Sequence, residues 1–365
     1  MRLILAILFL SFISCNKNTV DTNLLIGEWE FSPPNTEYNV DSSVSTTYYR
    51  SDIAFKKDSV FVISDGFFKR SEKQNLYLGD NSKYYVKRDS LYILTPDTKS
   101  YYSRFIYKLT KDTLAFQDKD SSIYYFKKKP IRKAENISLN QITVSAGACF
   151  GDCPINSTSI DDKGKLIFYG EAYNTQDGLF TSNMDPSIFR EIVHELNKIK
   201  FEVLKNNYGN YNVTDLPSAS ISFIQNGRIY KTIYDYGRSS PKELRRIISK
   251  IGYLYQTTKL DPVDYKYPII SSRFGDKISL LDSESFYLQT LIFSSQPTQS
   301  SFTPKYYNTS FLIKSENYND EEYDKLKRSI ETDGRFFKIQ DKNKNFTTFD
   351  LGYNFFDRNE VFKNK

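Results

Sequence analysis

The stretch SISFIQNGRIYKTIY, residues 220–234, decides how the middle of this 365-residue chain folds. Apolar and polar side chains alternate on both sides of Asn226-Gly227. An Asn-Gly pair between two such runs is the strongest short hairpin signal, because both residues tolerate the positive φ that the turn requires. The sequence therefore predicts a β-hairpin that joins Ser220–Ile224 to Ile229–Tyr234.

A helix is predicted directly after this hairpin. Ser240 is expected to cap its start, with Pro241 in the first turn and Glu243 completing a capping box. Apolar residues then recur at helical spacing, and they are Leu244, Ile247, Ile248, Ile251 and Leu254.

The same order of elements is predicted earlier in the chain. Ser157–Ile160 and Lys165–Tyr169 form a hairpin about the turn Asp161–Gly164, and a helix starts at Asp185-Pro186. One face of that helix is apolar and consists of Ile188, Phe189, Ile192, Val193, Leu196 and Ile199. Two hairpin-helix units can share one antiparallel sheet with both helices on one face, so an α+β sandwich is predicted for residues 140–260.

Two motifs in this segment carry a resemblance. The turn Cys149-Phe150-Gly151-Asp152-Cys153-Pro154 and the later stretch from Tyr208 to Asp215 resemble an uncharacterised domain family found in lipoproteins of Gram-negative bacteria. The resemblance runs over nearly the whole segment. It implies a domain boundary and a location, and it implies no known activity.

The N-terminal part, residues 23–128, consists of short alternating runs between polar turns. These runs are Ile53–Phe55, Val60–Ile63, Lys83–Val86, Leu91–Leu94, Phe105–Leu109, Leu114–Phe116 and Ile123–Phe126. Evenly spaced short strands predict a barrel or sandwich. The high content of Tyr and Phe, 29 and 28 residues, also favours β structure.

The start of this part resembles the Gly-x-Trp signature of lipocalin-like barrels, with Gly27 and Trp29 in the motif's positions. The resemblance implies an antiparallel β-barrel in which Trp29 plugs one end. Gly27 allows a tight turn, and the large ring of Trp29 favours burial. Two alternatives stay open for the barrel interior: a cavity for a small apolar ligand, or filling by the protein's own Tyr and Phe side chains.

A basic linker is predicted at residues 129–139, where Pro130 interrupts a run of Lys and Arg. The C-terminal extension, residues 261–365, is predicted to be α+β. Strands are expected around Phe286–Phe293 and Ser310–Lys314, and Phe336–Ile339 with Phe346–Leu351 forms a hairpin. A helix between them is expected to be capped by Asn319 with Glu322, and to carry Tyr323, Leu326 and Ile330.

The first fifteen residues predict export. Arg2 precedes an apolar run from Leu3 to Ile13, which is too short to remain as a membrane-spanning helix. Phe12-Ile13-Ser14-Cys15 resembles the cleavage box of bacterial lipoproteins, with Phe12 where Leu is usual. The resemblance implies that residues 1–15 contain a signal peptide ending at Cys15, which is acylated with palmitate-type chains, and that residues 16–22 form a polar tether.

The resemblance also implies that the protein is located in the bacterial cell envelope, on the outer membrane or a periplasmic face, with the membrane as a partner. The alternative is an ordinary signal peptide that leaves Cys15 as a free thiol. With Cys15 acylated, Cys149 and Cys153 remain, and an oxidising compartment favours a disulfide between them. Gly151 lets the short loop bend, and Pro154 follows it. A redox-active pair and a reduced pair are the alternatives.

No catalytic or metal constellation is found in the sequence. The single histidine, His194, lies within a predicted helix, and no set of ligands completes a metal site. Neither a nucleophile elbow nor a phosphate-binding loop is present, and no cofactor is predicted. The net charge of +6 is too small to suggest nucleic acid as a partner. We therefore expect binding of a small apolar ligand or an envelope protein, or a structural role; an enzyme acting on envelope glycans or lipids is the alternative.

Three turns of the N-terminal part share the order Asp, hydroxyl, aliphatic: Asp58-Ser59-Val60, Asp89-Ser90-Leu91 and Asp112-Thr113-Leu114. They resemble the O-glycan acceptor motif of some periplasmic bacterial proteins, which implies glycosylation of Ser59, Ser90 and Thr113. The alternative is that Asp and the hydroxyl residue close a turn and the aliphatic residue begins a strand.

Overall fold

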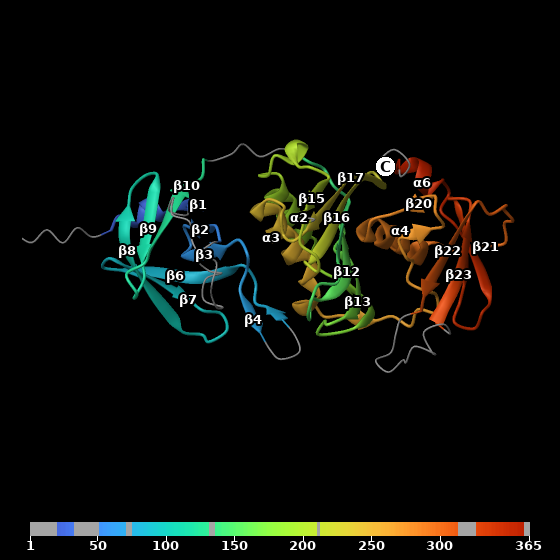
Figure 1. The fold of residues 1–365 in the computed structure, drawn as a ribbon, viewed down its shortest axis with the longest axis horizontal. Coiled ribbons are helices and arrows are strands. Elements are labelled where there is room, and N and C mark those ends of the chain that lie inside the picture. The colour runs from blue at the N-terminus through green and yellow to red at the C-terminus, as the bar shows by residue number, and fades with distance from the viewer. Residues whose placement is uncertain are drawn as a thin grey trace, which may run out of the picture. The chain divides into compact units, whose positions relative to one another are not determined.

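The structure is a computed structural model that describes residues 20–32, 51–70, 75–130, 136–209, 212–312 and 326–360. It divides into two compact units (Figure 1). Residues 1–61 and 82–129 make up the first unit, and residues 62–81 and 130–365 make up the second. The prediction of a mainly β protein is confirmed, since strands form a closed barrel and several sheets, and helices are few.

The first unit is a closed antiparallel barrel with the strand order β1-β10-β9-β8-β7-β6-β3-β2. Its strands are β1 (Gly27–Ser32), β2 (Ile53–Lys56), β3 (Val60–Ile63), β6 (Asn81–Lys87), β7 (Ser90–Leu94), β8 (Tyr101–Leu109), β9 (Thr113–Gln117) and β10 (Ile123–Lys128). A short 3-10 helix, η1 (Thr22–Leu25), precedes β1.

Aromatic rings pack against one another in the described part of the barrel interior. Trp29 is fully buried, and its indole N–H donates to the Leu25 carbonyl at 2.7 Å. The Phe55 ring lies 5.5 Å from that of Phe61, and Phe116 lies 5.8 Å from Phe126. These ring contacts favour the filled alternative for the described part of the interior.

Gly27 is needed where β1 begins. Its φ is +133°, and a Cβ atom there would approach the Lys128 side chain to 2.8 Å. Lys128 cannot easily move away, because its ammonium group donates to the Leu24 carbonyl at 2.8 Å and lies 4.8 Å from the Trp29 ring centre. Glycine at this position therefore allows the close approach of β10 to the start of β1.

An eight-stranded sheet forms the centre of the second unit, in the order β15-β17-β16-β11-β12-β13-β14-β18. Its strands are β11 (Gln141–Ala146), β12 (Ile155–Asp161), β13 (Lys165–Ala172), β14 (Gly178–Asn183), β15 (Asn207–Gly209), β16 (Ser218–Gln225), β17 (Arg228–Tyr236) and β18 (Asp261–Pro262). Asn226 and Gly227 join β16 to β17 with φ values of 53° and 68°, which is the turn that the sequence predicts.

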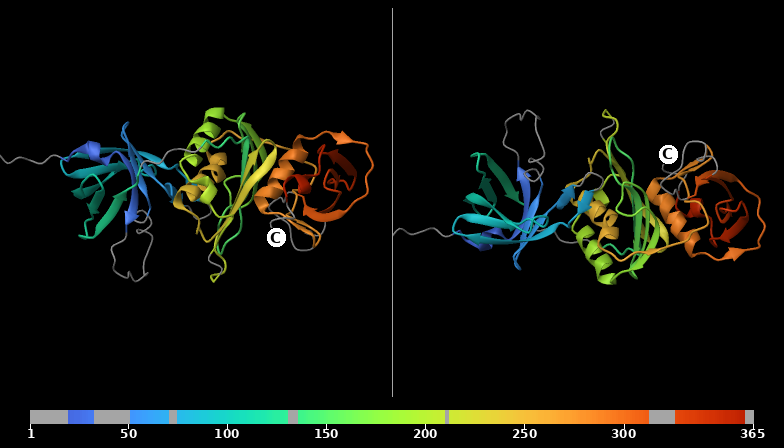
Figure 2. Two further views of the ribbon diagram at one scale, coloured as in Figure 1. Left: turned by 90° about the horizontal axis from the view of Figure 1, so that it is seen from above. Right: turned by 90° about the horizontal axis from the view of Figure 1, so that it is seen from below.

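Helices cover both faces of this sheet (Figure 2). On one face lie α2 (Pro186–Leu196) and α3 (Lys242–Gly252), with the 3-10 helices η2 (Phe201–Val203) and η3 (Leu254–Gln256). Ile142 and Val144 of β11 point to that face and belong to its apolar core. The alternate residues Thr143 and Ser145 point to the opposite face, which α4 (Asp282–Ser294) covers.

The start of α3 differs from the prediction. Pro241 occupies the N-cap position, and Ser240 makes no capping hydrogen bond. The hydroxyl of Ser240 donates instead to the carboxylate of Asp235 at 2.5 Å, and its backbone N–H donates to the same side chain at 3.0 Å. A buried acceptor on the preceding strand therefore takes the hydroxyl that the local pattern assigns to the helix.

Two further predictions in the C-terminal part are wrong. The segment Phe286–Phe293, expected to be a strand, lies in α4. This helix is buried on several sides, including Phe286, Tyr287, Leu288 and Ile292, so its apolar residues show no one-sided helical spacing. Ile330, expected on a helix, lies in a strand opposite Asn308 and Ile339, because pairing with distant strands outweighs local spacing. Asn319, Glu322 and Tyr323 lie outside the described residues.

A five-stranded sheet follows α4, in the order β21-β25-β24-β23-β22. Its strands are β21 (Pro297–Thr298), β22 (Tyr306–Phe311), β23 (Lys327–Thr332), β24 (Phe336–Gln340) and β25 (Phe346–Asp350), and α6 (Phe355–Arg358) packs beside it. Two short hairpins complete the unit, β19 (Arg273–Phe274) with β20 (Ile278–Ser279) and β4 (Phe68–Arg70) with β5 (Asn75–Tyr77).

The hairpin β4–β5 belongs to the second unit although it lies between two barrel strands in sequence. The Tyr77 backbone N–H donates to the Gln256 side chain at 2.8 Å. Close to it, the Arg246 guanidinium contacts the buried carboxylate of Asp80 at 2.5 Å and that of Glu195 at 3.4 Å. Through these contacts, the segment that contains β4 and β5 packs against α2, α3 and η3.

Candidate functional site

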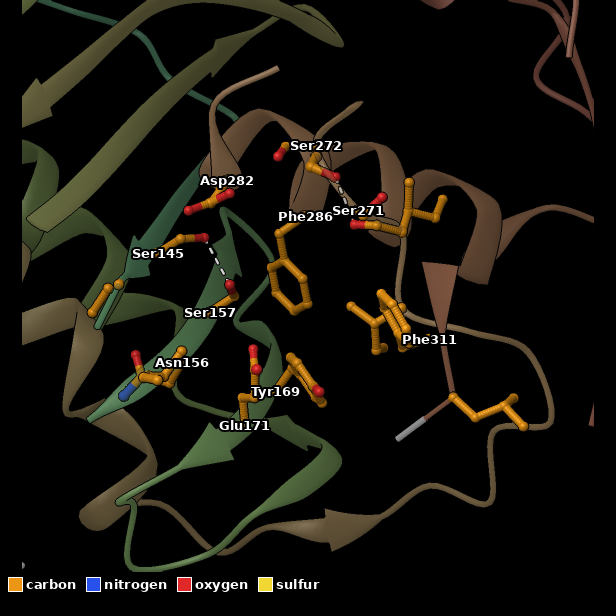
Figure 3. Close-up of a pocket in the computed structure, with 17 residues that line it drawn as sticks. Ser145, Asn156, Ser157, Tyr169, Glu171, Ser271, Ser272, Asp282, Phe286 and Phe311 are labelled. Carbon is orange, nitrogen blue, oxygen red and sulfur yellow. Dashed lines mark hydrogen bonds between the residues drawn. The ribbon is translucent and has the colours of Figure 1, made fainter. Parts of the chain in front are cut away.

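A pocket of about 260 Å³ lies on the α4 face of the central sheet (Figure 3). Strands β11, β12 and β13 form one wall of this pocket. The segment 269–272, the first turns of α4 and the end of β22 form the other. We refer to it as the sheet–α4 pocket.

The sheet wall is a row of polar side chains that strand pairing aligns. Ser145 of β11 pairs with Ser157 of β12, which pairs with Tyr169 of β13. The two serine hydroxyls are 2.7 Å apart and hydrogen-bonded. Glu171 lies at an irregularity of the β12–β13 pairing and also lines the pocket.

The opposite wall is held in place by hydrogen bonds to α4. The Ser285 hydroxyl donates to the Ile270 carbonyl at 2.7 Å, and the Ile270 N–H donates to the Gln289 side chain at 2.9 Å. The Ser271 N–H donates to the Ser310 hydroxyl at 3.0 Å. The segment 269–272 is therefore fixed against both α4 and β22.

The polar groups of the pocket are hydroxyls and carboxylates. Glu171 and Asp282 carry the negative charges, and no Lys, Arg or His is among the lining residues within the described parts of the chain. Tyr169, Phe286 and Phe311 add aromatic rings. Burial, and then the nearby Glu171, raises the pKa of Tyr169, so this phenol stays neutral at physiological pH.

Asp282 lies in the first turn of α4 and is exposed at the edge of the pocket. The surrounding protein nevertheless removes enough water to raise the pKa of its carboxyl group. A carboxylate that is kept where its charged form is disfavoured, in a concave site, is typical of functional sites.

The loop between β11 and β12 borders the pocket and contains the predicted disulfide. Cys149 and Cys153 are bonded, with their Cα atoms 5.7 Å apart. Gly151 between them has a φ of +114°. The Phe150 N–H donates to the Asp215 carbonyl at 2.8 Å, so the two motifs that resemble the uncharacterised family meet here.

The other predicted residues lie elsewhere. Gly27 and Trp29 are in the barrel, Pro154 directly precedes β12, and His194 is exposed on α2. Ser59 directly precedes β3, while Ser90 and Thr113 begin β7 and β9. Cys15 lies outside the described residues. The described parts of the chain contain no group of three or more His, Cys, Asp or Glu that could hold a metal ion.

Sequence reasoning does not find the sheet–α4 pocket. Ser145 alternates with apolar residues on β11, and Ser157 lies in a polar run on β12; both patterns are also typical of solvent-facing strands. None of the helices that the structure describes has the length and apolar character needed to cross a membrane.

Comparison with known proteins identifies one domain. Residues 140–255 match the model of a domain of unknown function, DUF6438. The match coincides with the segment in which the sequence resembles an uncharacterised family, and it includes the strands of the pocket's sheet wall but not α4. No curated protein and no solved structure matches the chain.

The raised pKa of Asp282 predicts a stability gain on neutralising it. A carboxyl group whose pKa is raised by folding stabilises the fold only when protonated, so the wild type loses this contribution as the pH rises above about 4. Asp282→Asn should therefore be more stable than the wild type at pH 7, by a small amount because the group is exposed, and the difference should vanish near pH 3.5. Urea unfolding at both values measures it.

Asp276→Asn is the control, because Asp276 is exposed in the turn between β19 and β20. This variant should show no gain at pH 7. A wild-type stability equal to or above that of Asp282→Asn at pH 7 would show that the pocket does not disfavour the carboxylate.

Proposed function

We propose that this protein is a lipid-anchored component of the bacterial cell envelope that binds a small, polar, amine-bearing molecule in the sheet–α4 pocket. The observation that carries the binding proposal is the composition of the pocket, where two carboxylates, several hydroxyls and three aromatic rings converge. Ligand binding would thus be the function of the second unit, which contains this pocket.

The chemistry of the lining selects the ligand class. Glu171 and Asp282 attract a positive charge, and an ammonium group also gains from the faces of aromatic rings. The serine hydroxyls both donate and accept hydrogen bonds, which suits a hydroxyl-bearing ligand. At about 260 Å³ the pocket is smaller than sites for drug-sized molecules, so the ligand is of the size of an amino sugar or a small amine.

Several observations support the envelope location. The signal-like start ends at Cys15, and the only other two cysteines are joined in a disulfide, as an oxidising compartment favours. A filled barrel interior supports a structural or partner-contacting role for the first unit rather than carriage of an apolar ligand.

We also propose the finer architecture that the sequence suggests. The lipocalin-like assignment of the first unit is supported by the barrel and by the position of Trp29 inside it. The hairpin β12–β13 is followed by β14 and then α2, and the hairpin β16–β17 is followed by α3, with both helices on the same face of the sheet. This order supports an internal hairpin-helix repeat within an α+β domain.

A second candidate is an enzyme that acts on envelope glycans. Two carboxylates in one pocket, one of them with a raised pKa, are the groups that glycosidases use as acid and base. The binding and enzyme proposals differ in outcome, because only an enzyme releases a product from the bound sugar.

The anchor proposal predicts fatty-acid labelling of Cys15. Protein expressed with a labelled palmitate should carry the label and sediment with membranes. Cys15→Ser should carry none, because the thiol that forms the thioether is absent. Cys149→Ser/Cys153→Ser, which keeps Cys15, should remain labelled. An unlabelled wild type that fractionates with soluble protein would contradict the anchor.

The pocket proposal predicts charge-selective binding. Glucosamine should bind more tightly than glucose, and glucuronate should bind least, in calorimetry at pH 7. Hydrogen bonds to charged groups contribute about 1.5–3 kcal/mol each, so Glu171→Gln/Asp282→Asn should weaken glucosamine binding at least about tenfold. Glu191→Gln/Asp276→Asn, which removes two exposed carboxylates elsewhere, should bind as the wild type does. Equal affinity for the three sugars would refute the assignment.

Glycosylation of Ser59, Ser90 and Thr113 remains a prediction from the sequence. Ser59 is exposed in a turn, and the other two are half-buried at strand starts, where the turn explanation also places them. The intact mass of protein from native membranes distinguishes the two explanations. A mass above that of peptide plus lipid, lost in Ser59→Ala/Ser90→Ala/Thr113→Ala, would support glycans; peptide plus lipid alone would end the hypothesis.

A further inference from the structure

The antiparallel order of the barrel gathers three hairpin turns at one end. Because every strand runs opposite to its neighbours, the ends of β2, β6, β8 and β10 meet the starts of β1, β3, β7 and β9. This end carries η1, the turns 56–59, 87–90 and 110–113, and residues 127–129. We refer to it as the tether end.

The three turns of the tether end have nearly the same sequence. They read KKDS at 56–59, KRDS at 87–90 and TKDT at 110–113, so each places a basic residue directly before an aspartate. Lys57, Arg88 and Lys111 are all exposed. The repetition places one cation at the tip of each hairpin.

Charge is distributed unequally between the two ends of the barrel. Exposed basic side chains at the tether end are Lys56, Lys57, Lys87, Arg88, Lys111 and Lys127; exposed acidic ones are Asp21, Glu28, Asp58 and Asp112, and Asp89 is half-buried. The described turns at the opposite end carry Lys99 and Lys119 against Asp97, Asp118 and Asp120. Lys and Arg side chains also reach further than Asp, so the outermost charges of the tether end are positive.

The chain enters the barrel at this same end. Lys128 and Trp29 hold η1 there through the carbonyls of Leu24 and Leu25. Only four residues lie between Cys15 and Val20, the first described residue, so the Cα atoms of Cys15 and Val20 are at most about 18 Å apart. An acyl group on Cys15 therefore brings the tether end within about two Debye lengths of the bilayer.

We propose that the tether end docks on an anionic lipid surface, with Lys57, Arg88 and Lys111 contacting phosphate-bearing headgroups. The inference rests on the proposed acyl anchor, and it adds an orientation to it. The barrel stands on the membrane with its three basic turns facing the lipid, instead of moving freely on a polar tether. The filled interior suits this role, because docking uses the end of the barrel and not its inside.

The test attaches the protein to vesicles independently of native acylation. A maleimide-bearing lipid is coupled to Cys15 of the mature chain, whose other two cysteines are joined in the disulfide. The conjugate is placed on vesicles of phosphatidylcholine, with or without phosphatidylglycerol. Acetylation of each lysine is then followed by mass spectrometry at low and high salt.

Lys57 and Lys111 should be protected at least about threefold on the anionic vesicles at low salt, and high salt should remove the protection. Lys99 and Lys119, at the opposite end, should react equally on both kinds of vesicle. Equal reactivity of Lys57 on anionic and neutral vesicles would overturn the docking proposal. Failure of native palmitate labelling would instead count against the anchor alone, since the conjugate does not depend on it.

A charge-reversed set of variants separates docking from general attraction. Lys57→Glu/Arg88→Glu/Lys111→Glu should lose the protection of Lys56 and Lys127, whereas Lys99→Glu/Lys119→Glu should retain it. Equal protection in both variants would show that no particular end faces the lipid. Glycans at Ser59, Ser90 and Thr113 would also overturn the proposal, because they would occupy the same end of the barrel.

Discussion

Buried hydroxyl groups that must find partners determine how the second unit is assembled. On the α4 face of the central sheet, Thr143, Ser159 and Ser222 are almost fully buried. A hydroxyl buried without a partner costs about 1–3 kcal/mol, so each must be satisfied within the protein. Thr143 pairs with Ser159 at 3.1 Å, and Ser222 pairs with Ser283 of α4 at 2.8 Å. These bonds fix α4 against the sheet in one register, which apolar contacts alone would specify less strictly.

The sheet–α4 pocket lies where this hydroxyl row is no longer covered. The Ser145–Ser157 pair continues the row, but it faces a cavity rather than α4. The row thus supplies preorganised polar groups at the edge of the interface between α4 and the sheet. Hydrogen bonds between hydroxyl groups also hold that interface rigid. The disulfide between Cys149 and Cys153 closes the loop that joins the two strands carrying these serines. Structural and binding roles therefore meet in β11 and β12.

Sequence patterns predict the elements that local chemistry decides. The Asn226-Gly227 turn, the Asp185 cap of α2 and the barrel strands all follow from residue types at short spacing. Burial of one segment by another that is distant in the sequence cannot be predicted from such local patterns. From the sequence alone, the serines and threonines of β11 and β12 would be assigned to a solvent-facing side. In the structure they are covered by α4, which lies more than a hundred residues later in the chain. For the same reason, the sequence does not predict α4, whose apolar residues lie all round the helix. It does not predict the pocket either, because the pocket is formed by two walls that are distant in the sequence.

The exposed charged turns of the first unit lie at the ends of the barrel, and its described interior is occupied by its own aromatic rings. The three turns of the tether end share a sequence but not a backbone geometry: φ is positive at Ser59 in the first turn, at Arg88 in the second and at no residue of 110–113. Asp, Ser and Thr are common turn residues in general, and the longer basic side chain extends outward. The shared sequence of the three turns is thus explained locally up to the aspartate and the hydroxyl. The turn itself does not require the basic residue before them, so the cations are the part of the motif for which an external partner has to account.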